Sequence, residues 1–326
     1  YLCQTRPDVI KTVHRNFLKA GADAVETNSF GSTRMKLDEY GVGEIVHQQN
    51  VTAARLAREV CDEFSTPERP RFVVGSMGPT GMMPSTNDPM LGQIRFDELS
   101  GLFREQARGL LEGGVDALLI ETVVDALEAR AAVYGVKQAM LDVARRVPIM
   151  VQASLDLTGR MLLGNDIGSW YWTLDGLGVD VVGMNCGVGP DYLRDPVRYL
   201  CENGRLAVSC IPNAGLPLNE GGRTVYPMKP KPFAELLGEF ARENGLNVVG
   251  GCCGTTPDHI AATAEAVRGI SGRPRWRMAP AEPRRIFAAS PMKAVALKQD
   301  GTVTLFGERL NAQGSKKVKE LLLADN

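Results

Sequence analysis

Two adjacent cysteines, Cys252 and Cys253, lie in a glycine-rich segment at residues 250–254 and are well suited to carry chemistry. A disulfide between neighbouring residues would be strained, so a shared metal explains the pair better. Zinc is the ion that sulfur-rich sites most often hold. A third cysteine, Cys186, likewise follows a short apolar run and precedes a glycine. The sequence therefore predicts a zinc site formed by Cys186, Cys252 and Cys253.

Three cysteine thiolates would leave one position of a tetrahedral zinc ion open, which is typical of catalytic sites. They also give the site a net charge of about −1, which makes the ion a poor activator of water. A substrate thiol can still bind as thiolate, and its sulfur stays electron-rich. Alkylation of a thiol is therefore the favoured chemistry. The alternatives are cysteines that only fill the core, a structural zinc or redox site, and a phosphate-binding turn, which the lack of a nearby Lys or Arg disfavours.

Other polar side chains stand where apolar runs end, and the candidates among them are Glu26, Thr27, Asn28, Glu121 and Asn213. No such run ends in a lysine or histidine, which makes a Schiff base or an imidazole general base a poor fit. Glu121 could pair with a cationic group of a substrate, or it could bond to a neighbouring backbone N–H. Glu26, Thr27 and Asn28 could line the same pocket or bond within its rim. Asn213 could equally be a turn residue.

Seven short apolar segments must position these residues, and each is predicted to be a buried β-strand. They cover residues 24–29, 72–79, 117–122, 149–154, 180–185, 207–212 and 247–251. Amphipathic patterns predict helices over 7–22, 43–63, 96–113, 125–145 and 257–269, and the helical pattern is weakest between 155 and 180. A doubly wound sheet and a (β/α)8 TIM barrel both fit. The barrel is favoured because polar and glycine residues follow every strand, and we expect it over residues 1–270 with its first strand preceding Tyr1.

The pattern changes after residue 270. Residues 271–300 are rich in proline and arginine without a sustained period, which predicts a linker that wraps over the barrel. Residues 303–306 then predict a strand, and residues 315–324 predict a helix. A segment this short cannot make a domain, so we expect residues 301–326 to be the first β/α unit of a second one.

Composition and charge restrict the classes of function. The 326 residues are 44% hydrophobic and 23% charged with a formal net charge of −1, which is ordinary for a globular protein. This balance does not indicate a nucleic-acid partner, and no apolar run is long enough to span a membrane. The odd number of cysteines, seven, and the absence of a signal-peptide pattern predict reduced thiols and a cytoplasmic location.

The segments NCG at 185–187 and GGCCGTTP at 250–257 resemble the motifs of the homocysteine S-methyltransferase family, and ETNSF at 26–30 is a further match. The resemblance covers residues 1–270 and implies a (β/α)8 barrel whose zinc ligands are Cys186, Cys252 and Cys253. It also implies that Glu121 binds the α-ammonium group of homocysteine and that Asn213 is a weak zinc ligand when homocysteine is absent. The Asp-Gly-Ala-Met-Gly-Thr type segment with which the family usually opens is not found in this chain, which is a departure from the pattern.

The segment GERLNAQGS at 307–315 resembles the opening of the pterin-binding barrel that follows this domain in cobalamin-dependent methionine synthases. That resemblance implies that Glu308 and Asn311 lie near a pterin. It further implies that methylcobalamin, carried by a cobalamin-binding domain and regenerated from methyltetrahydrofolate, methylates homocysteine to methionine. The alternatives are a relative that uses betaine or S-methylmethionine as methyl donor, and a barrel that binds a thiol or a metal without catalysis.

Overall fold

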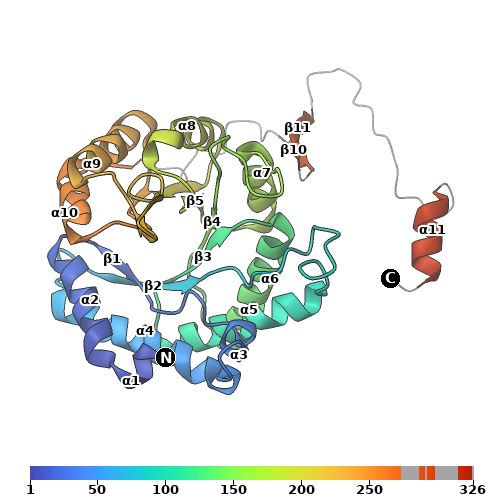
Figure 1. The fold of residues 1–326 in the computed structure, drawn as a ribbon, viewed down its shortest axis with the longest axis horizontal. Coiled ribbons are helices and arrows are strands. Elements are labelled where there is room, and N and C mark those ends of the chain that lie inside the picture. Colours follow the sequence, from blue (N-terminus) through green and yellow to red (C-terminus); the bar gives the residue numbers. More distant parts are fainter. Residues whose placement is uncertain (273–285, 291, 298–314, 325–326) are drawn as a thin grey trace.

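Seven strands form one parallel sheet that curls around a central axis (Figure 1). This computed structural model describes residues 1–272, 286–290, 292–297 and 315–324. The strands lie side by side in the order β1-β2-β3-β4-β5-β6-β9. Their bounds are β1 Ala24–Glu26, β2 Phe72–Met77, β3 Ala117–Val123, β4 Ile149–Ala153, β5 Val181–Asn185, β6 Ala207–Ile211 and β9 Val248–Val249. Each lies within or overlaps a predicted apolar segment, so the strand prediction is confirmed.

Helices on the outer side of the curl precede β1, connect consecutive strands and follow β9 (Figure 1). They are α1 Leu2–Thr5, α2 Pro7–Lys19, α3 Arg34–Asp38, α4 Val46–Phe64, α5 Phe96–Gly113, α6 Ala126–Asp142, α7 Ile167–Leu177, α8 Arg194–Asn203, α9 Pro230–Glu239 and α10 Pro257–Ala266. Local sequence sets several ends: Pro7 begins α2, the Asp125 side chain caps α6, and α5 ends at Gly114 with φ 98°. The predicted helices are confirmed with small shifts at their ends, and α7 forms where the helical pattern is weakest.

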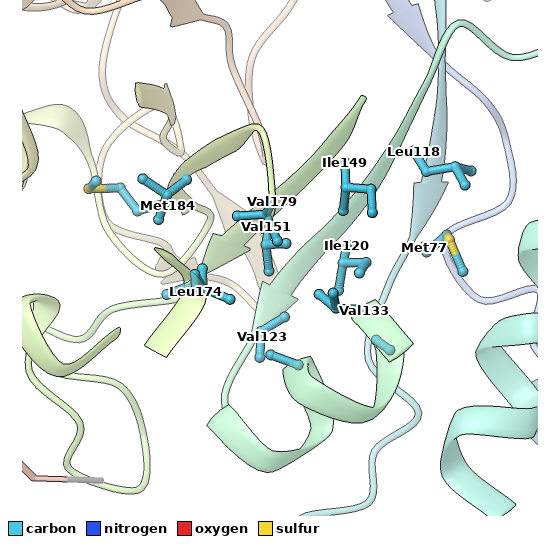
Figure 2. Packing of buried hydrophobic residues seen from close by; sticks show 14 of the residues in the cluster. Met77, Leu118, Ile120, Val123, Val133, Ile149, Val151, Leu174, Val179 and Met184 are labelled. Atoms are coloured by element: carbon cyan, nitrogen blue, oxygen red, sulfur yellow. The ribbon is translucent and has the colours of Figure 1, made fainter. Parts of the chain in front are cut away.

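The hydrophobic core lies between the strands and the helices (Figure 2). Leu118, Ile120 and Val151 of the sheet belong to one cluster with Val133 of α6 and Leu174 of α7, and none of the five is more than 1% exposed. Each fully buried side chain of this kind contributes about 1.5–3 kcal/mol to the free energy of unfolding. Continuous apolar runs therefore mark strands that are covered on both faces.

The sheet has β1 at one edge and β9 at the other, and no pairing joins these two strands within the described residues. The helices continue around that side, because α10 packs against both α9 and α2. A curled seven-stranded parallel sheet is consistent with a TIM-like barrel, while the eighth strand stays a prediction. Over the described ranges, no helix has both the length and the apolar surface that a membrane crossing requires.

Two antiparallel hairpins lie outside the predicted pattern. β7 Leu218–Glu220 and β8 Arg223–Val225 form one of them between β6 and α9. β10 Ile286–Ala289 and β11 Ala294–Leu297 form the other. The second hairpin lies within the predicted linker at 271–300, where the sequence shows no sustained period. Its strands have only four residues each, too few for an alternating pattern to stand out in the sequence.

The second hairpin packs against α7. Phe287 stacks on Trp172 with ring centroids 3.8 Å apart and 16° between the ring planes. Ser169 Oγ donates a hydrogen bond to the carbonyl oxygen of Ser290 at 2.8 Å. These contacts agree with a segment that lies on the barrel, whereas its role as a linker between domains stays a prediction.

Near the end of the chain, α11 Lys316–Leu323 confirms the predicted helix over 315–324. The predicted strand over 303–306 lies outside the described residues, so the start of a second barrel is not tested. The same holds for Glu308 and Asn311, the two residues that the resemblance places near a pterin.

Candidate functional site

The polar residues predicted from the sequence lie at the C-terminal ends of the parallel strands. Cys186 directly follows β5, and Cys252 and Cys253 follow β9 after two glycines. Glu121 lies near the end of β3, and Asn213 lies just beyond the end of β6. Because the carboxyl ends of parallel strands share one edge of the sheet, side chains far apart in the sequence can meet there.

The three cysteine sulfurs form a compact cluster. Cys186 Sγ lies 3.8 Å from Cys253 Sγ, and Cys252 Sγ lies 3.9 Å from Cys253 Sγ. All three sulfurs are within 4.8 Å of one another, and each cysteine is partly exposed. A tetrahedral zinc ion with Zn–S distances of about 2.3 Å places its sulfur ligands about 3.8 Å apart. The donor types and their spacing therefore fit zinc.

The backbone turns these cysteines toward one another. Cys186 has φ 57° and Gly187 has φ 66°, so the chain leaves β5 through two left-handed residues. This conformation is uncommon for a residue other than glycine and persists only where the surrounding structure imposes it. The N–H of Cys252 donates to the carbonyl oxygen of Pro212 at 2.8 Å, which ties the paired cysteines to the end of β6.

The sulfurs share negative charge unequally. A hydrogen bond with Cys252 is the main cause that lowers the pKa of Cys186 to about 5. The same hydrogen bond raises the pKa of Cys252, and burial followed by the Cys186 charge raises the pKa of Cys253. One thiolate thus disfavours the next, because like charges repel. A cation among the sulfurs is needed to keep all three ionised near neutral pH.

Asn213 and Tyr226 contact this cluster. Asn213 Oδ1 accepts the N–H of Cys253 at 3.1 Å, and the Asn213 side chain also hydrogen-bonds Cys186. Tyr226, just after β8, lies so close over Gly254 that a Cβ on this glycine would be 2.2 Å from Tyr226 Cβ. Burial, followed by a hydrogen bond to Cys253, raises the pKa of Tyr226 to about 12. The hairpin of β7 and β8 therefore brings a phenol to the sulfurs.

Glu121 is only 5% exposed, and both of its carboxylate oxygens accept side-chain hydrogen bonds. Ser76 Oγ donates to Oε1 at 2.5 Å, and Asn185 Nδ2 donates to Oε2 at 3.0 Å. Burial, with a contribution from the Cys186 charge, raises the pKa of Glu121 to about 7. A cationic partner would offset the cost of burying this carboxylate in its charged form.

Glu26, Thr27 and Asn28 at the end of β1 differ in their surroundings. Glu26 keeps an exposed surface, although the protein atoms around it, and then the Glu121 charge, raise its pKa to about 8. Thr27 is buried, and its Oγ1 accepts the N–H of Ser76 at 3.0 Å. Asn28 donates to the sulfur of Cys3 at 3.5 Å. Thr27 and Asn28 thus make internal contacts, and Glu26 is the member of this group that interacts with Glu121.

Ser76, Asn185 and Tyr226 contact the predicted site residues without being among them, and Thr122, which follows Glu121, hydrogen-bonds Asn185. Ser76, Thr122 and Asn185 lie at or near the C-terminal ends of strands, which is a signal that the sequence contains. Tyr226 has no such signal, because it lies in a loop beyond a short hairpin whose strands the sequence pattern does not show.

Enzymes with parallel β/α sheets place their reacting groups at this edge, and convergent thiols there are typical of metal or thiol chemistry. The class of protein is therefore a TIM-like β/α enzyme. Its family follows from comparison: the profile of the homocysteine S-methyltransferase family matches residues 1–267, and the chain belongs to this family. The prediction that the chain belongs to a family of methyltransferase enzymes is thereby confirmed.

Proteins of similar sequence and structure agree with this assignment. The chain is 42% identical over 325 residues to the methionine synthase of Mycobacterium tuberculosis and 40% identical over 328 residues to that of Mycobacterium leprae. Both matches cover 100% of this chain and 26% of the relative, so the chain spans about a quarter of their length. The metallated form of the Escherichia coli homocysteine methyltransferase MmuM has 20% identity and a TM-score of 0.66, with 81% of this chain and 86% of that chain covered. This structural similarity shows the shared fold.

Proposed function

We propose that this chain binds homocysteine and presents its thiol for methylation within a cobalamin-dependent methionine synthase. The observation that carries the proposal is the convergence of three sulfurs within 4.8 Å of one another. The Nδ2 atom of Asn185 lies 3.0 Å from Glu121 Oε2 and 3.9 Å from Cys252 Sγ, so the buried carboxylate of Glu121 lies close to the sulfurs. The two mycobacterial methionine synthases support homocysteine as the methyl acceptor.

Cys186, Cys252 and Cys253 would hold a zinc ion, since the donor types and the sulfur spacing both suit it. When bound, zinc supplies the positive charge that keeps a substrate thiol ionised at neutral pH. We also assign Asn213 as a weak ligand in the absence of homocysteine, because its side chain contacts both Cys186 and the backbone of Cys253. This chemistry needs reduced cysteines, and none of the seven, which all lie in the described residues, forms a disulfide; this supports a cytoplasmic location.

Homocysteine carries an ammonium group in addition to its thiol. Glu121 would accept that ammonium, because both of its oxygens are already oriented by hydrogen bonds and a cation offsets its burial. Glu26 adds a second carboxyl that interacts with Glu121. Thr27 and Asn28 would support this rim through their contacts with Ser76 and Cys3.

In the reaction, a lone pair of the homocysteine sulfur forms the new S–CH3 bond. The bond between the methyl carbon and its donor breaks at the same time, and its electron pair leaves with the donor. We assign methylcobalamin on a separate cobalamin-binding domain as this donor and methyltetrahydrofolate as the source of the methyl group. The pterin would bind a second barrel through Glu308 and Asn311, and the seven parallel strands would belong to a (β/α)8 barrel.

Titration calorimetry of the zinc-loaded chain with homocysteine tests the central step. Free thiols of this type have a pKa near 8.5, so binding as thiolate at pH 7 should release about one proton per site. Repeating the titration in buffers with different ionisation enthalpies measures that number. Glu121→Gln should weaken binding and still release the thiol proton, while the part of the wild-type release that comes from Glu121, whose pKa is about 7, should be lost. Homocysteine that binds the wild-type chain without releasing a proton would contradict the proposal.

The methyl donor is tested by supplying methylcobalamin, betaine or S-methylmethionine with homocysteine and measuring methionine. We expect methionine only from methylcobalamin. Methionine formed from betaine or S-methylmethionine alone would instead assign the chain to the simpler branch of the family. If none of the three donors gives methionine although homocysteine still binds, the result would support a barrel that binds homocysteine without catalysis.

A further inference from the structure

The side-chain amide of Asn185 joins two strands that are not neighbours in the sheet. Its Nδ2 donates to Glu121 Oε2 at 3.0 Å and to Thr122 Oγ1 at 2.8 Å, and its Oδ1 accepts the N–H of Thr122 at 2.7 Å. Asn185 ends β5, whereas Glu121 and Thr122 belong to β3, and β4 lies between them in the sheet. Asn185 is only 1% exposed, so water competes little for these bonds.

The backbone that these bonds hold is strained. Thr122 has φ 58°, which is an outlier for a β-branched residue, and the pairing of β3 with β4 shifts register between Ile120 and Val123. Such a conformation costs about 1–3 kcal/mol and persists where the surrounding structure determines it. Asn185 holds Thr122 in this conformation, because it forms hydrogen bonds with both the N–H and the hydroxyl of Thr122. The direction of the preceding side chain, Glu121, therefore depends on Asn185.

Asn185 also lies beside the sulfurs. It directly precedes Cys186, and its Nδ2 is 3.9 Å from Cys252 Sγ. One buried amide thus contacts the carboxylate proposed for the ammonium and lies against the cluster proposed for the thiol. Homocysteine carries these two groups on a short chain, so the separation between the two halves of the site decides whether both can bind at once.

We propose that Asn185 is a positioning residue that sets the separation between the Glu121 carboxylate and the cysteine sulfurs. It thereby makes the site selective for thiols that carry an ammonium group. The inference rests on the proposed function, since it assumes that Glu121 binds the ammonium of a thiol held at the cysteines. It adds that the amide, by holding Thr122 and Glu121, determines how much that ammonium contributes to binding.

The test compares two thiols by calorimetry on the zinc-loaded chain: homocysteine and 4-mercaptobutyrate, which is homocysteine without its amino group. In Asn185→Ala the affinity for homocysteine should fall about tenfold to a hundredfold, the effect of losing a hydrogen bond to a charged group. The affinity for 4-mercaptobutyrate should stay close to that of the wild type. Zinc content is measured alongside, and it should remain stoichiometric. Asn185→Leu keeps the number and branching of the side-chain heavy atoms and serves where the alanine variant does not fold.

Gln152→Ala is the matched control, because it removes another buried amide from the neighbouring strand β4, where Gln152 Nε2 donates to Ser209 Oγ at 2.9 Å. It should leave the preference for homocysteine over 4-mercaptobutyrate unchanged. Equal losses for both thiols in the Asn185 variants, or no loss for homocysteine, would overturn the positioning role. A wild-type chain that binds the two thiols equally well would instead refute the ammonium role of Glu121 in the proposed function.

Discussion

Replacing Cys186 by alanine should abolish stoichiometric zinc binding. The three sulfurs lie at the spacing of ligands to one ion, so loss of Cys186 leaves only the adjacent pair Cys252 and Cys253. Zinc sites with four protein ligands bind with about 10–16 kcal/mol, which is roughly 2.5–4 kcal/mol per ligand. The zinc affinity of Cys186→Ala should therefore fall about a hundredfold to a thousandfold.

Competition with a chromophoric chelator measures this affinity, and elemental analysis after dialysis measures the metal content. Cys201→Ala is the matched control, because Cys201 is a 1% exposed core cysteine of α8 and is not one of the three clustered thiols. The control should retain wild-type zinc. If Cys186→Ala keeps stoichiometric zinc at wild-type affinity, Cys186 is not a ligand and the proposed thiol chemistry loses its basis.

Three further predictions concern other parts of the chain. Burial raises the pKa of Glu128 from 4.5 to about 7, so the free energy of unfolding should fall by about 2–3 kcal/mol as the pH rises from 4.5 through 7. Urea denaturation should therefore show Glu128→Gln to be more stable than the wild type at pH 8 but not at pH 4.5, and an equal difference at both would refute this. Gly187 has φ 66°, and a Cβ added to it would lie only 2.2 Å from the carbonyl oxygen of Leu155. Gly187→Ala should therefore lose about 1–3 kcal/mol of stability and should also lose zinc. A variant with the wild-type urea midpoint and zinc content would contradict the clash. Phe287→Ala removes the ring that stacks on Trp172. Limited proteolysis within 286–297 should then become faster, while homocysteine binding should stay unchanged. An unaltered cleavage rate would show that the stacking does not hold the hairpin in place.

The alternation of strands and helices was predictable because it depends on local patterns. The runs that became β2, β3 and β4 begin with three or four consecutive apolar residues, as expected of strands covered on both faces, and their polar residues come only later in each strand. The start of α10 is equally local: Thr256 caps it, and Pro257 occupies its first position. The two hairpins escaped prediction, since their strands of three or four residues carry too little pattern.

The sequence by itself determined the kind of chemistry. Three cysteines beside glycines at the ends of apolar runs were enough to predict a sulfur-rich metal site, and the flanking motifs indicated the family. Those signals are residue types and short spacings, which exist before the chain folds.

Only the tertiary structure decided how the side chains of the candidate site are oriented toward one another. Asn185 and Glu121 are 64 residues apart in the chain, and their hydrogen bond depends on sheet order and on the left-handed backbone of Thr122. Tyr226 reaches Cys253 only because a surface hairpin returns over the site. Such contacts join residues whose relative directions no local pattern contains, since register and backbone strain arise only when the strands have come together.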